Sequence, residues 1–155
     1  MPVDSSILFT PLKIGHQTVR NRIVLPPMVV NRDLSGKDGQ EWYGRRAQGV
    51  GLAIVEATNV TDFGEKYTAQ NLRPLVDAIH NGGAMAAIQL FPGVRGQATV
   101  PAQLTEQQID QLVDTYRTAA ETCAETGFDG IAPLLKEAEH TVNAAKQLPR
   151  LVEYE

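Results

Sequence analysis

Cysteine occurs only once in this sequence of 155 residues, at Cys123. A single thiol excludes an internal disulfide and any metal site built from several thiolates. The shortage of cysteine is typical of reducing compartments, so we expect a cytoplasmic protein. Cys123 falls near the apolar side of a predicted helix, which favours a buried, inert thiol over a nucleophile.

Long apolar runs and clusters of basic residues are missing as well. No apolar run approaches the roughly 18 residues of a membrane span, and the first residues lack the basic and apolar regions of a secretory signal. The formal charge is −4, and acidic and basic residues are scattered along the chain. Since no basic stripe is available for phosphates, we expect neither a nucleic acid nor a membrane as a partner.

Three short motifs of nucleotide and acyl chemistry do not occur: G-x-G-x-x-G, G-x-x-x-x-G-K-S/T and G-x-S-x-G. Their absence disfavours dinucleotide-binding, P-loop and hydrolase functions. The acidic residues Glu41, Glu56 and Asp62 show no paired spacing, and we expect no metal site. Glu56 lies inside a predicted strand, where we expect it to face a polar layer or to pair with an arginine.

Strand and helix patterns alternate along the chain. Apolar and β-branched runs predict four buried strands, at residues 21–25, 52–57, 86–91 and 128–131. Apolar spacing and capping signals predict four helices, over 41–48, over 72–79, from 105 toward Gly127, and over 134–148. Residues 8–19 alternate around a Gly15-His16 turn, which predicts a β-hairpin ahead of the sheet.

This alternation predicts an α/β fold in which right-handed crossovers join parallel strands. An open doubly wound sheet and half of a barrel both satisfy the pattern, whereas a complete (β/α)8 barrel needs about 250 residues. The length fits one domain, and we expect residues 1–155 to form it. Ligands of parallel α/β folds bind at the carboxyl ends of the strands, which here are residues 26–29, 57–59 and 89–95.

Four separated blocks carry a family resemblance: LFTPLKIGHQTVRNRIVLPPM, EWYGRRAQGVGLAIVEATNV, LVDAIHNGGAMAAIQLF and LTEQQIDQLVDTYRTAAETCAETGFDGI. In this order they resemble the N-terminal half of the Old Yellow Enzyme family of FMN-dependent oxidoreductases, over residues 7–131. The resemblance implies a (β/α)8 TIM-barrel type of fold, truncated to about four βα units with an N-terminal β-hairpin. Residues 132–155 match no part of the family and would form a helical tail.

The resemblance also implies FMN as the cofactor, NAD(P)H as the reductant and a small-molecule electron acceptor. The flavin-binding residues that it implies come from three strand ends and are Pro26, Pro27, Met28, Val29, Ala57 and Gln89. Val29 stands where the family usually has Thr or Cys, and a valine side chain donates no hydrogen bond to tune the ring. The Gln89 amide has a donor and an acceptor, which suits the flavin edge. A polar barrel-layer residue bonded to neighbouring backbone is the alternative for Gln89.

The chain departs from the family after its fourth strand. The family has a His-x-x-His or His-x-x-Asn pair there, but Ile131 is followed by Ala132-Pro133-Leu134. The family's phosphate-binding loops are also missing, and no catalytic residue is assigned. Two functions stay open: an FMN-dependent NAD(P)H oxidoreductase whose chain is incomplete, and a noncatalytic half-barrel that self-associates. Exposed edges and apolar faces favour association, so we expect a homo-oligomer, with a homodimer as its simplest form.

Overall fold

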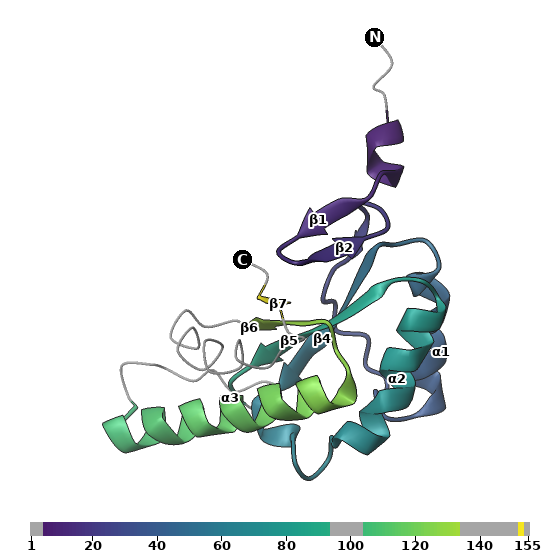
Figure 1. Cartoon of the computed structure of the whole chain (residues 1–155). Coiled ribbons are helices and arrows are strands. Elements are labelled where there is room, and N and C mark those ends of the chain that lie inside the picture. The colour runs from purple at the N-terminus through teal and green to yellow at the C-terminus, as the bar shows by residue number, and fades with distance from the viewer. Residues whose placement is uncertain (1–4, 94–103, 134–151, 154–155) are drawn as a thin grey trace.

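The computed structural model describes residues 5–93, 104–133 and 152–153, and its main feature is a parallel sheet (Figure 1). The sheet has the strand order β3-β4-β5-β6-β7, and every neighbouring pair is parallel. Its strands are β3 (Val24–Leu25), β4 (Leu52–Asn59), β5 (Met85–Phe91), β6 (Gly130–Pro133) and β7 (Val152–Glu153). Because neighbouring strands are parallel, their carboxyl ends meet at one edge of the sheet, where the functional residues are expected.

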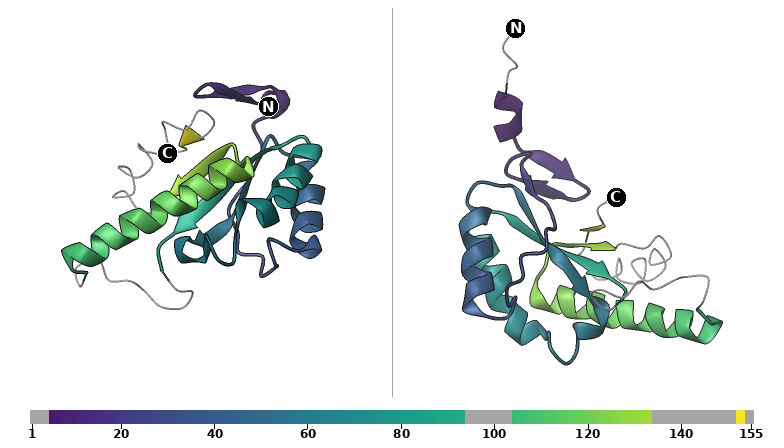
Figure 2. Two further views of the ribbon diagram at one scale, coloured as in Figure 1. Left: turned by 60° about the horizontal axis from the view of Figure 1, so that its bottom comes forward. Right: turned by 180° about the vertical axis from the view of Figure 1, so that it is seen from behind.

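Three α-helices connect the strands β3, β4, β5 and β6 of the parallel sheet. They are α1 (Lys37–Ala47), α2 (Ala69–Asn81) and α3 (Glu106–Thr126), and η2 (Val60–Asp62) is a short 3-10 turn after β4. Ahead of the sheet lie η1 (Ser6–Phe9) and the hairpin of β1 (Leu12–Ile14) and β2 (Gln17–Val19), at one end of the sheet (Figures 1 and 2). None of the described helices combines the length and apolarity that crossing a membrane requires.

The helix boundaries follow from local chemistry. Thr68 and Thr105 each open a helix with a reciprocal capping box, in which the hydroxyl accepts a backbone N–H and the third residue's side chain accepts the threonine N–H. Gly127 ends α3 in the left-handed conformation with φ of 99°, which glycine adopts without steric cost. These two signals confirm the predicted helices at 72–79 and from 105 onward.

The two faces of the sheet are packed differently. Alternate strand residues such as Val55, Ile88 and Leu90 are fully buried in the large core shared with the helices. Residues of the opposite face, including Leu52 and Ala87, form a smaller cluster with Val19 of the hairpin. The helix-covered face therefore holds most of the core, while the hairpin covers only part of the other face, which we call the open face.

A bulge interrupts the pairing of β4 with β5. Val55 pairs with Ile88, but the next pair joins Thr58 to Leu90. Two residues of β4, Glu56 and Ala57, therefore lie opposite Gln89 alone. A bulge of this kind turns adjacent side chains in different directions and is common beside functional sites.

Several predicted boundaries are corrected by the structure. The first strand is confined to β3, because the Asn21 side chain accepts the N–H of Ile23 and holds the preceding residues in a turn. The helix predicted over 41–48 begins at Lys37, and the fourth strand is shifted to Gly130–Pro133.

The C-terminal part of the chain adds a strand that the sequence patterns did not predict. Residues 132 and 133 complete β6, and β7 pairs beside it, so the described sheet has five strands where four were predicted. The helix predicted over 134–148 lies outside the described residues.

Candidate functional site

A cleft of about 480 Å³ lies at the carboxyl ends of β4 and β5 and is bounded by the segment after β3. Its lining includes Glu56 and Ala57 from β4, Phe91 from β5, and Asn31 from the segment that follows β3. Residues of three consecutive strand ends thus meet at this cleft. This is the location that ligands prefer in parallel α/β folds.

Two of the six predicted flavin-binding residues lie opposite each other. Ala57 lines the cleft, and the β-bulge sets it opposite Gln89, which is half-buried on the neighbouring strand. The Gln89 amide offers both a donor and an acceptor, and the Ala57 side chain is a single methyl group. Gln89 itself is not among the residues that line the cleft, so Ala57 is the one predicted flavin-binding residue in that lining.

The other four predicted residues form the turn after β3. The N–H of Met28 donates to the carbonyl of Pro26 at 2.9 Å, which closes a tight turn around Pro27. Met28 and Val29 are about half exposed, at 50% and 51%. These four residues are not among those that line the cleft. The turn therefore leads into the cleft through the residues that follow it, beginning with Asn31.

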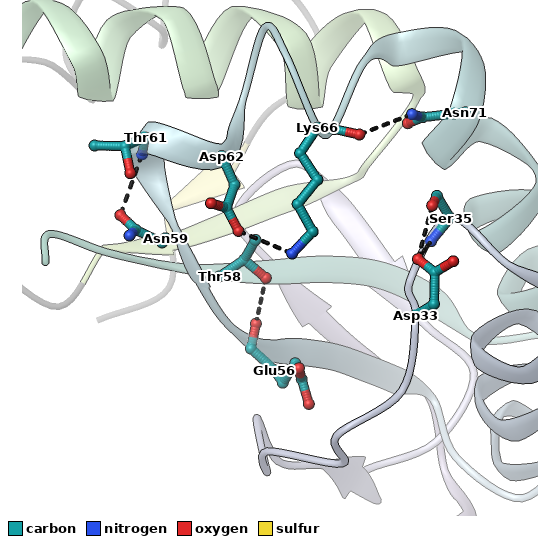
Figure 3. Close-up of polar contacts among 9 residues, drawn as sticks. All are labelled: Asp33, Ser35, Glu56, Thr58, Asn59, Thr61, Asp62, Lys66 and Asn71. Atoms are coloured by element: carbon teal, nitrogen blue, oxygen red, sulfur yellow. Dashed lines mark hydrogen bonds and ion pairs between the residues drawn. The ribbon is translucent and has the colours of Figure 1, made fainter. Parts of the chain in front are cut away.

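The cations of the cleft are paired with acidic side chains. The Lys66 ammonium lies 3.2 Å from the Asp62 carboxylate and 4.6 Å from the centre of the Tyr67 ring, and Figure 3 shows it reaching across the loop to Asp62. Tyr67, and then Asp62, raise the pKa of Lys66. Arg32 likewise forms an ion pair with Asp38. Because the positive charge of each residue is balanced by a neighbouring carboxylate, Arg32 and Lys66 provide little attraction for a phosphate.

Glu56 lies inside β4, as the sequence patterns predicted, but its hydrogen-bond partners were not predicted. Its carboxylate accepts a hydrogen bond from the backbone N–H of Val30, and its own N–H donates to the Tyr43 hydroxyl at 2.9 Å. The sequence signal was an acidic residue inside an apolar strand. That signal indicated a special environment but did not identify the partners, which lie 26 and 13 residues away.

The loop between β3 and α1 is ordered by its own side chains. Asp33 accepts hydrogen bonds from the N–H of Ser35 at 3.0 Å and from its hydroxyl at 2.7 Å. The Ser35 hydroxyl is the main cause of the lowered pKa of Asp33. These contacts, drawn in Figure 3, lie directly before α1 and follow the cleft-lining residues Asn31 and Arg32.

A model of the NADH:flavin oxidoreductase / NADH oxidase family matches residues 7–101, which is more than half of the chain. The chain belongs to this family. Members of the NADH:flavin oxidoreductase family use FMN, with NAD(P)H as the reductant. The match covers the hairpin, β3, β4 and β5, and it includes all six predicted flavin-binding residues.

Curated relatives share about three residues in ten with the chain. The 12-oxophytodienoate reductase 1 of Oryza sativa subsp. japonica is 29% identical in an alignment 164 positions long, which covers 80% of this chain and 43% of that protein. An NADPH dehydrogenase of Listeria welshimeri serovar 6b is 32% identical in an alignment 162 positions long, which covers 81% of this chain and 47% of that protein. The chain thus spans less than half the length of these relatives.

Solved structures show the same fold at lower identity. Morphinone reductase superposes with a TM-score of 0.76 at 21% identity, over 94% of this chain and 61% of that chain. The Old Yellow Enzyme from Pichia sp. AKU4542 gives a TM-score of 0.71 at 23% identity, over 85% and 46%. These neighbours are TIM barrels, so the parallel sheet and its helices correspond to part of a barrel.

Proposed function

We propose that this chain belongs to an FMN-dependent NAD(P)H oxidoreductase of the ene-reductase type. The observation that carries the proposal is the β-bulge, which sets Ala57 opposite Gln89 where β4 and β5 end. Family membership supports the cofactor, and the half-buried amide supports the position of its ring. The electron acceptor would be a small molecule that reaches the flavin through the cleft.

Each proposed binding residue has a distinct task. Gln89 would donate to and accept from the alternating N–H and C=O groups of the flavin edge, and Ala57 would let the ring approach the backbone of β4. Pro26, Pro27 and Met28 would contact the ring through the backbone of their turn. Val29 would pack beside it without donating a hydrogen bond. The flavin, when bound, supplies the transfer of hydride from NAD(P)H to an electron-poor acceptor.

We further propose that residues 1–155 form a single partial-barrel domain of about four βα units, with residues 132–155 as a tail outside the family pattern. The partial barrel is supported by the relatives, which the chain matches over less than half of their length. The separate tail is supported by the family model, whose match ends at residue 101. A reducing compartment such as the cytoplasm suits a chain with one buried cysteine.

The first test is a titration of FMN fluorescence with the purified chain, together with its visible absorbance. We expect saturable quenching, and Gln89→Ala should weaken FMN binding about tenfold, which is the loss of one hydrogen bond of about 1.4 kcal/mol. Gln111→Ala, on the exposed side of α3, is the matched control and should bind as the wild type does. The absence of binding at high micromolar FMN would refute the proposal.

A second candidate function is a noncatalytic half-barrel that self-associates. The observation in its favour is that several apolar side chains are exposed, since Ile7 is 56% exposed, Phe9 66% and Val24 45%. Burial of such side chains would favour a homodimer. Sedimentation across a range of protein concentrations tests this candidate. A mass that stays monomeric at every concentration would exclude it, whatever the flavin titration shows.

A further inference from the structure

Glu56 joins two segments that are distant in sequence but both belong to the candidate site. It lies in β4 directly before Ala57, and only 6% of its surface is exposed. Its carboxylate accepts the N–H of Val30, the residue that follows the turn of Pro26, Pro27, Met28 and Val29. One side chain therefore connects the strand that carries Ala57 to the end of the proposed flavin-contacting turn.

The backbone of Glu56 is fixed from two other directions. The bulge frees its N–H from regular pairing with β5, and this N–H donates to the hydroxyl of Tyr43 on α1 at 2.9 Å. Its carbonyl accepts the Thr58 hydroxyl at 2.8 Å, as Figure 3 shows. The backbone that carries the carboxylate is therefore held in place. Of the two segments that the carboxylate joins, the turn after β3 is the more exposed.

Packing alone does not favour a carboxylate at this position. Burial of an acidic side chain costs free energy, and an apolar residue of similar size is often neutral or stabilising in its place. The hydrogen bond to Val30 gives the carboxylate a task that an apolar residue cannot perform. That task is to set the position of the turn relative to β4.

We propose that Glu56 is a positioning residue, which fixes the segment 26–30 against β4 and thereby sets the spacing between the turn and the pair of Ala57 and Gln89. The inference rests on the proposed flavin function for its effect on FMN. Binding groups that are misplaced by a small distance lose much of their effect, so this spacing matters for affinity.

Two substitutions separate the acceptor from the size of the side chain. Glu56→Gln keeps an oxygen that accepts the Val30 N–H, whereas Glu56→Met keeps the length and removes the acceptor. We expect amide hydrogen exchange of Val30, measured by NMR without FMN, to be at least about tenfold faster in Glu56→Met and close to wild type in Glu56→Gln. Glu121→Gln, exposed on α3, is the control.

The flavin readout uses the same variants. Glu56→Met should weaken FMN binding about tenfold and shift the visible absorbance of bound flavin, and Glu56→Gln should restore both. A general loss of stability would not shift the spectrum of the bound flavin. If Glu56→Met fails to fold, Val30→Pro removes the donor instead and should weaken FMN binding to a similar extent.

The outcomes are distinguishable. Unchanged Val30 exchange in folded Glu56→Met overturns the inference, and so does faster exchange with unchanged FMN affinity and spectrum. If the wild type binds no FMN, the proposed function fails. The exchange rates of Val30 then decide separately whether Glu56 fixes the turn.

Discussion

The helix-covered face and the open face of the parallel sheet differ in how completely they are packed. Val55, Ile88 and Leu90 are wholly buried against the helices, whereas Ile54 and Gln89 on the other strand face are only half-buried. Buried apolar area is the main source of stability. The fold therefore depends mainly on the helix-covered face, and the half-buried positions of the open face are the ones that a ligand or further barrel strands would cover.

The largest expected effect comes from a truncation in the helix-covered core. Leu75 of α2 is fully buried, and Leu75→Ala should lower the free energy of unfolding by about 2–5 kcal/mol because it leaves a cavity. Ile54→Ala on the open face should cost clearly less. Urea denaturation measures both values, and equal losses would show that the two faces contribute equally to stability.

Tyr43 tests the link between the helix-covered core and the bulge. Tyr43→Phe removes the acceptor of the Glu56 N–H and leaves this buried donor unsatisfied, so it should destabilise the protein by about 1–3 kcal/mol. Urea denaturation again measures the effect. A neutral result would show that the bulge does not depend on α1.

Tyr116 provides the opposite case within the same core. Its hydroxyl is buried and has no hydrogen-bond partner among the described residues, and burial raises its pKa. Tyr116→Phe should therefore be neutral or stabilise the protein by about 1 kcal/mol. A loss as large as that of Tyr43→Phe would reveal a partner for this hydroxyl.

The smallest expected effect concerns the ion pair between His80 of α2 and Asp129, the residue before β6. His80 Nε2 lies 2.8 Å from a carboxylate oxygen of Asp129, whose backbone carbonyl accepts the Gln17 side chain of the hairpin. The hydrogen bond to Asp129, and then the charges of Asp129 and Asp77, raise the pKa of His80 above its ordinary value of 6.5. The raised pKa means that protonated His80 stabilises the folded state.

This contribution has a defined pH dependence. It is fully present below pH 6.5 and is lost as the pH rises through the higher folded-state pKa. The pair is partly exposed, so the contribution should stay below about 1 kcal/mol. Melting temperatures at about pH 5 and about pH 8 should differ more for the wild type than for His80→Gln, and identical differences would contradict the prediction.

Local chemistry explains what could be predicted from the sequence. Helical spacing of Leu72, Leu75, Val76 and Ile79 and the capping box at Thr105 act within a few residues, and the structure confirms both helices. In the same way, the structure confirms the strands predicted at 52–57 and 86–91, which are β4 and β5. Patterns of this range predict where elements lie and which faces are buried.

The remaining features depend on contacts between distant segments. The bulge at Glu56 and Ala57 arises from the register of two strands, and the hydrogen bond from Val30 joins residues 26 positions apart. The pairing of β7 with β6 joins Gly130 to Val152. No periodicity within a single element encodes such pairings. The six predicted flavin-binding residues came from the family resemblance, and their roles stay predictions until FMN binding is measured.

The short outermost strands have a consequence for aggregation. In the described sheet both end strands, β3 and β7, contain only two residues each. Each therefore exposes few unpaired backbone groups to a passing strand, and short edge strands are one way in which natural sheets avoid growing into fibrils. Association through these two end strands should consequently depend on side-chain contacts, which mild detergent disperses, and not on an extended cross-β ladder.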